Sequence, residues 1–469
     1  MRRTTRYHSD RFRLNNQLMW PILLVVFLSP FVFGSTKPVF WLLWSMVTSL
    51  CGAVLFGRMA LSNARFRIAP RNLPVLFSLF AALGIYMAVQ VLPLGALSAG
   101  VSSVADPGTV IPIDTISLTP HDTILALVRW GTYGLLFFLV LQITSNPQRA
   151  RTFVTFIYWA IVIHAVVALL FLLQFGDTIL GIPKWKYFGS AMGGFINRNS
   201  FATFLAFGSV LGINLMIERM TEKPVGKGDS SALGIYLGKG GVVTIGLGWV
   251  ILIITLVVTN SRMGVFAACC GMIASTILAL AKGAGHSSRI GMWVLLLLIP
   301  VSVGLGMIGY GAIFVERLGE VGTASDVRMQ LYQQVVSMIE TRPLLGFGGN
   351  SFEYAYPLFH EAPVSFDLVW DKAHSTYLAL WAEYGLVFGS VPLLIVGIIL
   401  FQLAAAYLKA PGQDMLLRCG LGVVLVAAVH SLVDFSLEIE AVTFAFVAIV
   451  ATAWARQFEL RHAAGKDVA

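Results

Sequence analysis

The stretch VVTIGLGWVILIITLVVT, residues 242–259, contains 18 residues and no charged side chain. An α-helix of roughly 20 apolar residues crosses the hydrocarbon core of a bilayer, because a helix satisfies its own backbone hydrogen bonds where no water is present. Similar runs recur along the chain of 469 residues, which is 57% hydrophobic and only 12% charged. A soluble domain is typically about 25% charged. The composition therefore predicts an all-α, polytopic membrane protein.

Twelve apolar segments are candidate transmembrane helices. They cover residues 18–34, 38–57, 72–93, 124–143, 152–173, 199–218, 242–259, 263–281, 292–312, 386–408, 419–439 and 441–456.

A basic arm before the first apolar segment predicts the orientation of the chain. It contains Arg2, Arg3, Arg6, Arg11 and Arg13, and no small-residue cleavage site follows, so we expect no signal peptide. An N-terminus in the cytoplasm places most of the 32 Lys and Arg residues on the cytoplasmic side, as the positive-inside rule requires. We therefore expect both termini to be cytoplasmic. Binding of the arm to anionic lipid is an alternative role.

These segments divide the chain into five parts. We expect a basic cytoplasmic tail (1–17), transmembrane helices one to nine (18–312), one large periplasmic loop (313–375), helices ten to twelve (376–456) and a second cytoplasmic tail (457–469). Long connections of this kind are often functional.

The large loop itself has a helical pattern. Ser325 is a candidate N-cap, and the apolar residues that follow fit one helix face up to Pro343, where a glycine-rich turn begins. The residues of that face are Leu331, Val335, Met338 and Ile339.

Four arginines stand at outer membrane boundaries or within the membrane. Arg198 and Arg262 each precede an apolar segment on the outer side, Arg328 lies on the edge of the loop helix, and Arg129 lies inside the fourth segment. A guanidinium is a planar fork of donors that suits phosphate oxygens. Converging arginines would suit a diphosphate at the outer headgroup level. The alternative is that each arginine reaches a lipid headgroup or pairs with a carboxylate.

Other titratable residues lie near the same boundary. His374, at the end of the large loop, could accept a proton from a sugar hydroxyl, because imidazole titrates near neutral pH; capping or headgroup contact is the alternative. His430 and Asp434 are four residues apart and are predicted to share a helix face. They could hydrogen-bond each other and lock packing, relay a proton or contact substrate. Glu383 precedes Gly385, where we expect a bend, and could balance an arginine or hydrogen-bond an acceptor.

Several sequence patterns are absent. The chain has no DxD pair, no P-loop and no HExxH motif, and its four cysteines all lie in apolar segments. We therefore expect no metal, no cofactor, no disulfide and no nucleic-acid partner. The cytoplasmic connections are too short for a nucleotide-binding domain, so the membrane itself is expected to deliver the substrate.

Five motifs occur in order along the chain: GGFINRNSFATFLAF (193–207), TNSRMGVFA (259–267), RMQLYQQVVSMIETRPLLGFGGNSF (328–352), AHSTYLALWAEYGLVFG (373–389) and HSLVDFSLEIEA (430–441). Together they resemble the O-antigen ligase and polysaccharide polymerase superfamily of bacterial inner membranes.

The resemblance implies a C-type glycosyltransferase-like fold with a periplasmic site and an undecaprenyl-diphosphate-linked glycan donor. By position, Arg198 and Arg262 match arginines that hold the diphosphate, His374 matches the residue that activates the acceptor, and Arg328 matches a loop arginine of less defined role. Ser375 stands where Asn is more usual, and Met263 where Gly is frequent. Neither difference removes a charged group.

The expected function is metal-independent transfer of a glycan to an acceptor sugar hydroxyl. A lipid-linked glycan as acceptor would make the protein a polymerase, lipid A-core a ligase, and a protein hydroxyl an oligosaccharyltransferase. The alternatives from other classes are a transporter or flippase and a non-catalytic member of a polysaccharide assembly complex. Transporters often have two similar halves, whereas the halves of this chain look unlike.

Overall fold

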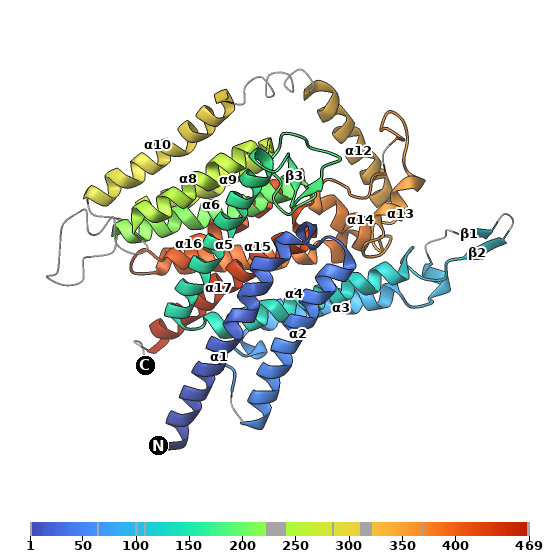
Figure 1. The fold of residues 1–469 in the computed structure, drawn as a ribbon. Coiled ribbons are helices and arrows are strands. Elements are labelled where there is room, and N and C mark those ends of the chain that lie inside the picture. The colour runs from blue at the N-terminus through green and yellow to red at the C-terminus, as the bar shows by residue number, and fades with distance from the viewer. Residues whose placement is uncertain are drawn as a thin grey trace.

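The computed structural model describes residues 2–62, 65–98, 102–106, 109–221, 241–283, 286–309, 321–367 and 369–466. Its described part is dominated by α-helices (Figure 1). The α-helices are α1 (Arg2–Leu28), α2 (Pro38–Leu61), α3 (Pro74–Gln90), α4 (Pro120–Thr144), α5 (Pro147–Leu173), α6 (Arg198–Thr221), α8 (Val242–Val258), α9 (Arg262–Ala281), α10 (His286–Gly309), α12 (Val321–Thr341), α13 (Phe352–Ala355), α14 (Thr376–Gly389), α15 (Val391–Lys409), α16 (Met415–His430) and α17 (Glu440–Lys466).

Short elements join these helices. The 3-10 turns are η1 (Ser29–Phe31), η2 (Phe33–Ser35), η3 (Pro70–Asn72), η4 (Gly95–Leu97), η5 (Tyr356–Leu358) and η6 (Ser436–Glu438). Two antiparallel hairpins pair β1 (Ser102–Asp106) with β2 (Thr109–Pro112), and β3 (Thr178–Ile179) with β4 (Ile182–Pro183).

The predicted all-α polytopic fold is confirmed. Among the described residues, eight helices are long and apolar enough to cross a membrane, and four further apolar helices have 10–17 residues. The four shorter ones are Pro74–Gln90, Val242–Val258, Arg289–Val301 and Met415–His430. Each of the twelve predicted segments overlaps one of these helices, although the ninth prediction runs past Gly309 into residues outside the described part. Twelve crossings remain a prediction.

The prediction of a continuous eleventh helix over 419–439 is wrong at its C-terminal end. Helix α16 ends at His430, and a turn and η6 follow before α17 begins at Glu440. The carbonyls of Ser431 and Asp434 accept hydrogen bonds from the backbone N–H of Thr376, at 3.1 and 3.2 Å. These carbonyls therefore face another segment of the chain, and the helix cannot continue through them.

Helix α6 is the central element of the bundle. Every residue of its most apolar 18-residue stretch is buried inside the protein, whereas only 28% of the corresponding stretch of α15 is buried. Small residues allow this enclosure: a Cβ on Gly208 would lie 2.7 Å from Ile161, and one on Gly212 would lie 2.7 Å from Tyr158. Close approach at small residues is the usual basis of helix association in membranes, where lipid supplies no hydrophobic driving force.

Helix α12 differs from the prediction only at its N-terminal end. It begins at Val321, so Ser325 lies inside the helix and the predicted N-cap is wrong. The predicted apolar face is confirmed, since Leu331, Val335 and Met338 are fully buried. The helix ends at Thr341, just before Pro343, as expected.

A glycine turn after α12 packs on α14 at the predicted bend. Gly385 has a φ of 70°, and a Cβ there would lie 2.3 Å from the carbonyl oxygen of Leu344. The backbone N–H of Phe347 donates to Ala382 at 2.9 Å, and that of Gly348 donates to Glu383 at 2.9 Å. The turn therefore fixes the position of α14, at whose N-terminus His374 stands.

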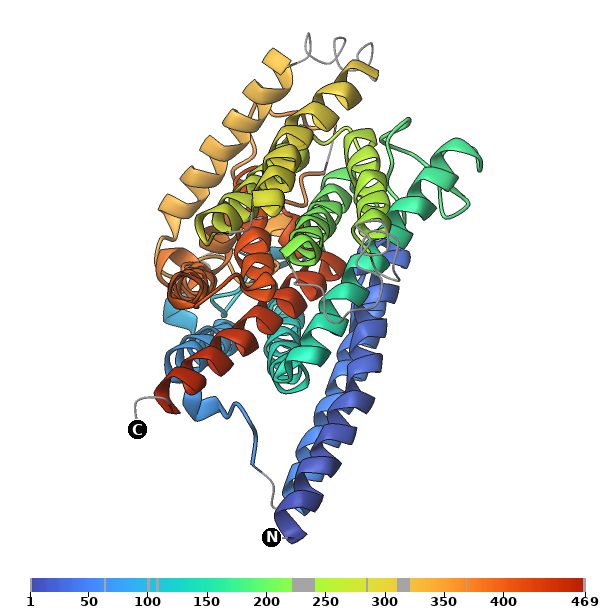
Figure 2. The same cartoon turned by 90° about the vertical axis from the view of Figure 1, so that its left-hand side faces the viewer.

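The two ends of the bundle differ. The first turn of α1 and the last turn of α17 lie away from the hairpin β3–β4 and from α12, which are found towards the opposite end of the molecule (Figures 1 and 2). We call that opposite end, with residues 174–197 and 342–375, the loop end. The first residues of α6 and α9 also lie there.

Candidate functional site

Arg198 and Arg262 are the first residues of two neighbouring helices, α6 and α9. A Cβ built on Gly264 would lie only 2.6 Å from the Cβ of Ala202, so the two helices pack closely near their N-terminal ends. Arg198 is half-buried and Arg262 is exposed. The helix packing therefore places Arg198 and Arg262 at neighbouring helix N-termini at the loop end.

Ser190 lies between the two helix starts. Its hydroxyl oxygen accepts a hydrogen bond from Arg198 Nη1 at 3.5 Å and another from Asn260 Nδ2 at 3.0 Å. Asn260, in the turn between α8 and α9, has a left-handed φ of 55°. The ring of Tyr187 lies 4.9 Å from the guanidinium carbon of Arg198. The segment before α6 therefore joins both arginine-bearing ends.

The electrostatics at this point favour an anion. A helix N-terminus carries a partial positive charge and directs its free N–H groups outward. Here two such ends stand side by side, each headed by an arginine. Phosphate groups bind at such ends, and guanidinium groups add charge-assisted hydrogen bonds.

His374 occupies a constrained position at the same end. Its φ of 52° is rare for a residue other than glycine. Its ring meets Trp370 and Phe435 edge to face, at centroid distances of 5.8 and 5.1 Å. The Tyr332 hydroxyl donates to its carbonyl oxygen at 2.9 Å. Its Nδ1 is buried and has no hydrogen-bond partner among the residues that the structure describes.

The His374 side chain is held in its neutral form. Burial and the positive charge of Arg328 lower its pKa below the ordinary value of 6.5, and they outweigh the opposing charges of Asp434 and Asp371. Arg328 is exposed on α12, one turn before Tyr332. The structure thus brings Arg328 to the His374 side of the site.

Asp434 connects the histidine to the arginines. Its carboxylate accepts a hydrogen bond from Asn199 Nδ2 at 3.1 Å, and its carbonyl oxygen accepts from the Thr376 backbone at 3.2 Å. Asn199 follows Arg198, and Thr376 lies two residues after His374. Asp434 therefore links the segment that carries Arg198, predicted to bind the diphosphate, to the segment that carries His374, the predicted general base.

His430 and Asp434 do not share a helix face, so this prediction is wrong, because α16 ends at His430. They are joined indirectly. The Ser436 hydroxyl donates to the Asp434 carboxylate, the Thr203 hydroxyl donates to Ser436 at 2.8 Å, and Thr203 lies 2.5 Å from His430 Nδ1. Spacing within one segment could not reveal Thr203, because it comes from α6.

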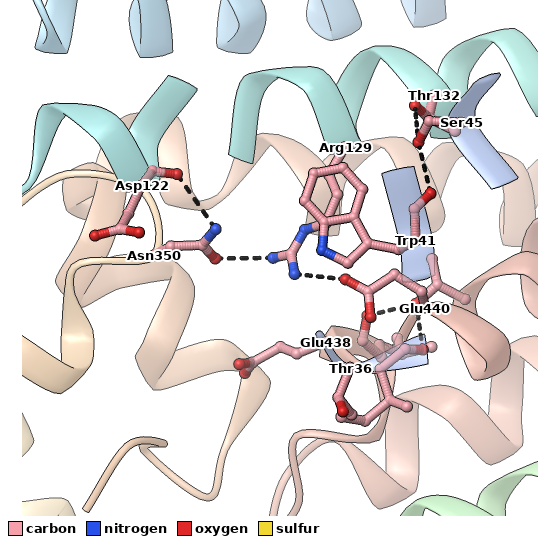
Figure 3. A network of polar contacts seen from close by, with 12 residues as sticks. Thr36, Trp41, Ser45, Asp122, Arg129, Thr132, Asn350, Glu438 and Glu440 are labelled. Carbon is pink, nitrogen blue, oxygen red and sulfur yellow. Dashed lines mark hydrogen bonds and ion pairs between the residues drawn. The ribbon is translucent and has the colours of Figure 1, made fainter. Parts of the chain in front are cut away.

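Arg129 belongs to a different network (Figure 3). It donates to the Glu440 carboxylate at 2.7 Å and to Asn350 Oδ1 at 2.8 Å, and it lies 5.9 Å from the Trp41 ring. Asn350 Nδ2 donates in turn to the Asp122 carbonyl at 3.3 Å. This arrangement matches the alternative reading of a carboxylate-paired arginine, and it ties α4 to α17 and to the glycine turn.

Glu383 stands beside that network. Burial and the Glu438 carboxylate raise the pKa of Glu383 to about 7, although Lys372, an Asn350 backbone hydrogen bond and Arg129 act in the opposite direction. Lys372 forms an ion pair with Glu438 at 3.0 Å. Lys372 lies two residues before His374, so the second network adjoins the site without including the outer arginines. No group of three or more His, Cys, Asp or Glu side chains suited to a metal occurs within the described ranges.

Comparison with known proteins adds one finding. Residues 247–394 match a family model described as O-antigen ligase. The matched segment contains Arg262, Arg328, His374 and Glu383, whereas Arg198 lies before it. The remaining candidates outside it are Arg129, His430 and Asp434. A search among curated proteins finds no significant match.

Proposed function

We propose, because residues 247–394 match the family model described as O-antigen ligase, that the chain transfers a glycan from undecaprenyl diphosphate to an acceptor sugar hydroxyl without a metal. The superfamily indicates an enzyme of the ligase or polymerase type. The observation that supports this donor is the pairing of Arg198 and Arg262 at adjacent helix starts, connected to His374 through Asn199, Asp434 and Thr376.

In this proposal His374 is the general base. Its pKa is lowered by burial and Arg328, so the imidazole is neutral near pH 7 and can accept a proton. As the acceptor oxygen bonds to the anomeric carbon, its proton passes to the imidazole. The bond from that carbon to the diphosphate oxygen breaks, and its electron pair leaves with the diphosphate. A single displacement inverts the anomeric centre.

The arginines stabilise the leaving group. Arg198 and Arg262 hold the diphosphate, and the charge that grows on it is met by donors that the helix packing has already placed. Arg328 adds positive charge from the side of His374. We assign supporting roles to Arg129, Glu383, His430 and Asp434, which hold the helices that carry these three groups. The contacts that the structure gives these four residues are to other side chains and backbone groups of the protein, which fits a structural role.

The proposed setting is the bacterial inner membrane. Its apolar helices make the chain a multi-pass membrane protein. We place the loop end in the periplasm and both termini in the cytoplasm, because most Lys and Arg residues then fall on the cytoplasmic side. The acceptor would be a lipid-linked glycan or lipid A-core, and the enzyme would work within a polysaccharide assembly complex.

The test is glycan transfer by purified protein in lipid nanodiscs, with lipid-linked donor extracted from the native host and its membrane glycolipids as acceptor. His374→Ala is expected to lower turnover by about 10²–10⁴-fold, the usual contribution of a general base. His360→Ala is the matched control, because His360 lies in the same loop and stacks on Phe366. Near-normal transfer by the His374 variant would remove it from the mechanism. Donor movement across liposomes without bond formation would identify a transporter instead.

A further inference from the structure

The connection between α5 and α6, which contains the hairpin β3–β4, exposes large apolar side chains close to Arg198. Trp185 is 54% exposed and Phe188 is 64% exposed. Leu173, the last residue of α5, and Phe175 and Ile182, on the connection that follows it, are also exposed. We call these five side chains the hairpin platform. Large exposed apolar side chains this near to each other in the chain can form a binding surface.

The hairpin is fixed to the arginine site by buried polar contacts. Lys184 is almost fully buried; its ammonium pairs with the Asp177 carboxylate and donates to the Ser190 carbonyl at 2.7 Å. The other Asp177 oxygen accepts from the Gly189 backbone at 2.8 Å. These bonds close the hairpin onto Ser190, whose hydroxyl accepts from Arg198. The platform therefore has a defined position relative to the guanidinium.

Neighbouring residues that follow β4 contact either the Arg198 cation or the outside of the protein. Tyr187 covers the Arg198 guanidinium at 4.9 Å, while Phe188 and Trp185, on either side of it in the chain, are exposed. One short segment thus has an inner face that meets the cation and an outer face that is apolar. A ligand that fits both faces is an anion joined to a hydrocarbon chain.

We propose that the hairpin platform binds the first isoprene units of a polyprenyl diphosphate while Arg198 and Arg262 hold its diphosphate. This rests on the proposed function. With the diphosphate at headgroup level, the adjoining isoprene units must cross a hydrated zone before they reach the acyl chains. An apolar surface at that level removes them from water. Interfacial aromatic residues can also anchor a protein in lipid; continuity with the Arg198 contact favours the carrier chain.

The experiment compares two glycan-free probes that differ only in the hydrocarbon chain. Undecaprenyl diphosphate and inorganic diphosphate are titrated into purified full-length protein in phosphatidylcholine nanodiscs. Trp185→Ala/Phe188→Ala is expected to weaken binding of undecaprenyl diphosphate about tenfold, equivalent to roughly two methylene groups left in water. Its affinity for inorganic diphosphate is expected to stay within about twofold of wild type, because no guanidinium contact is changed.

Two further variants serve as controls. Trp293→Ala/Phe401→Ala removes two exposed apolar side chains from α10 and α15 and should leave both affinities unchanged. Arg198→Ala should weaken both probes. If Arg198→Ala changes neither, the proposed function fails. If Arg198→Ala weakens both probes but the hairpin variant matches wild type, the platform only anchors the protein in lipid and this inference alone fails.

A second measurement does not depend on folding of the hairpin variant. A photoreactive polyprenyl diphosphate, with its reactive group on the second isoprene unit, is crosslinked to wild-type protein. The labelled peptide is expected to fall within residues 173–188, and excess undecaprenyl diphosphate should abolish labelling. Labelling confined to other segments would overturn the inference.

Discussion

Gly264→Ala is the sharpest test of how the helix packing sets the arginine site. A Cβ at position 264 would lie 2.6 Å from the Ala202 Cβ and 2.9 Å from the Ser261 hydroxyl. Carbon atoms in ordinary contact are about 3.5–4.0 Å apart, so the starts of α6 and α9 must separate by about 1 Å. Arg198 and Arg262 would move apart by a similar distance, because each begins its helix. Misplacement by about 1 Å can cost about 100-fold in rate.

We therefore expect Gly264→Ala to lower glycan transfer by about 10–100-fold and to weaken diphosphate binding. Overpacking should also cost about 1–3 kcal/mol of stability. Transfer is measured in nanodiscs at saturating donor, and stability by thermal unfolding in detergent. Gly131→Ala is the control, because a Cβ there meets no atom within 4 Å. If folded Gly264→Ala protein has wild-type turnover and diphosphate affinity, the spacing of the two helix starts does not govern the site.

Three other variants test neighbouring parts of the structure. Catalysis by neutral His374 should fall as the pH drops through the lowered pKa of this histidine. Arg328→Ala should move this acidic limb of the pH–rate profile to higher pH, because Arg328 lowers the pKa of His374. An unmoved limb would contradict the assignment of His374 as the general base. Arg129→Met leaves the Glu440 carboxylate buried and should cost about 3–5 kcal/mol in thermal unfolding; Arg129→Met/Glu440→Leu should recover most of it, and equal losses would refute the pairing argument. Tyr332→Phe removes the hydrogen bond to the His374 carbonyl, whose contribution is about 0.5–1.5 kcal/mol. Turnover should fall by up to about tenfold, while the acidic limb of the pH–rate profile should not move. Unchanged turnover would show that this bond does not position the imidazole.

Composition and periodicity predicted the elements that depend on local physics. The apolar segments became helices because membrane insertion needs only length and hydropathy. Pro343 ended α12 and Gly385 bent α14, because both effects act on the residue's own backbone. The predicted N-cap at Ser325 failed because the helix already begins at Val321.

The failures at the site have a different cause. His430 and Asp434 were predicted to share a face, but the backbone leaves the helix between them to bond with Thr376. The partners Asn199, Thr203 and Ser436 carry no distinctive spacing, since each is an ordinary polar residue whose partner lies far along the chain. Sequence patterns therefore located the charged groups, and only the packed structure shows what connects them.

The burial of α6 explains why some of these connections exist. Thr203 is buried on α6 and cannot reach water, so its hydroxyl must find partners on adjoining elements; Asn199, half-buried at the start of the helix, has a partner there as well. Those partners, Asp434 and Ser436, stand in the turn on which the start of α14 is docked. The hydrogen bonds that satisfy the buried Thr203 hydroxyl and the Asn199 amide therefore link α6, which carries Arg198, to the turn that contacts the start of α14. The position of His374 therefore depends on contacts that α6 makes with this turn, although His374 follows a long loop in the sequence.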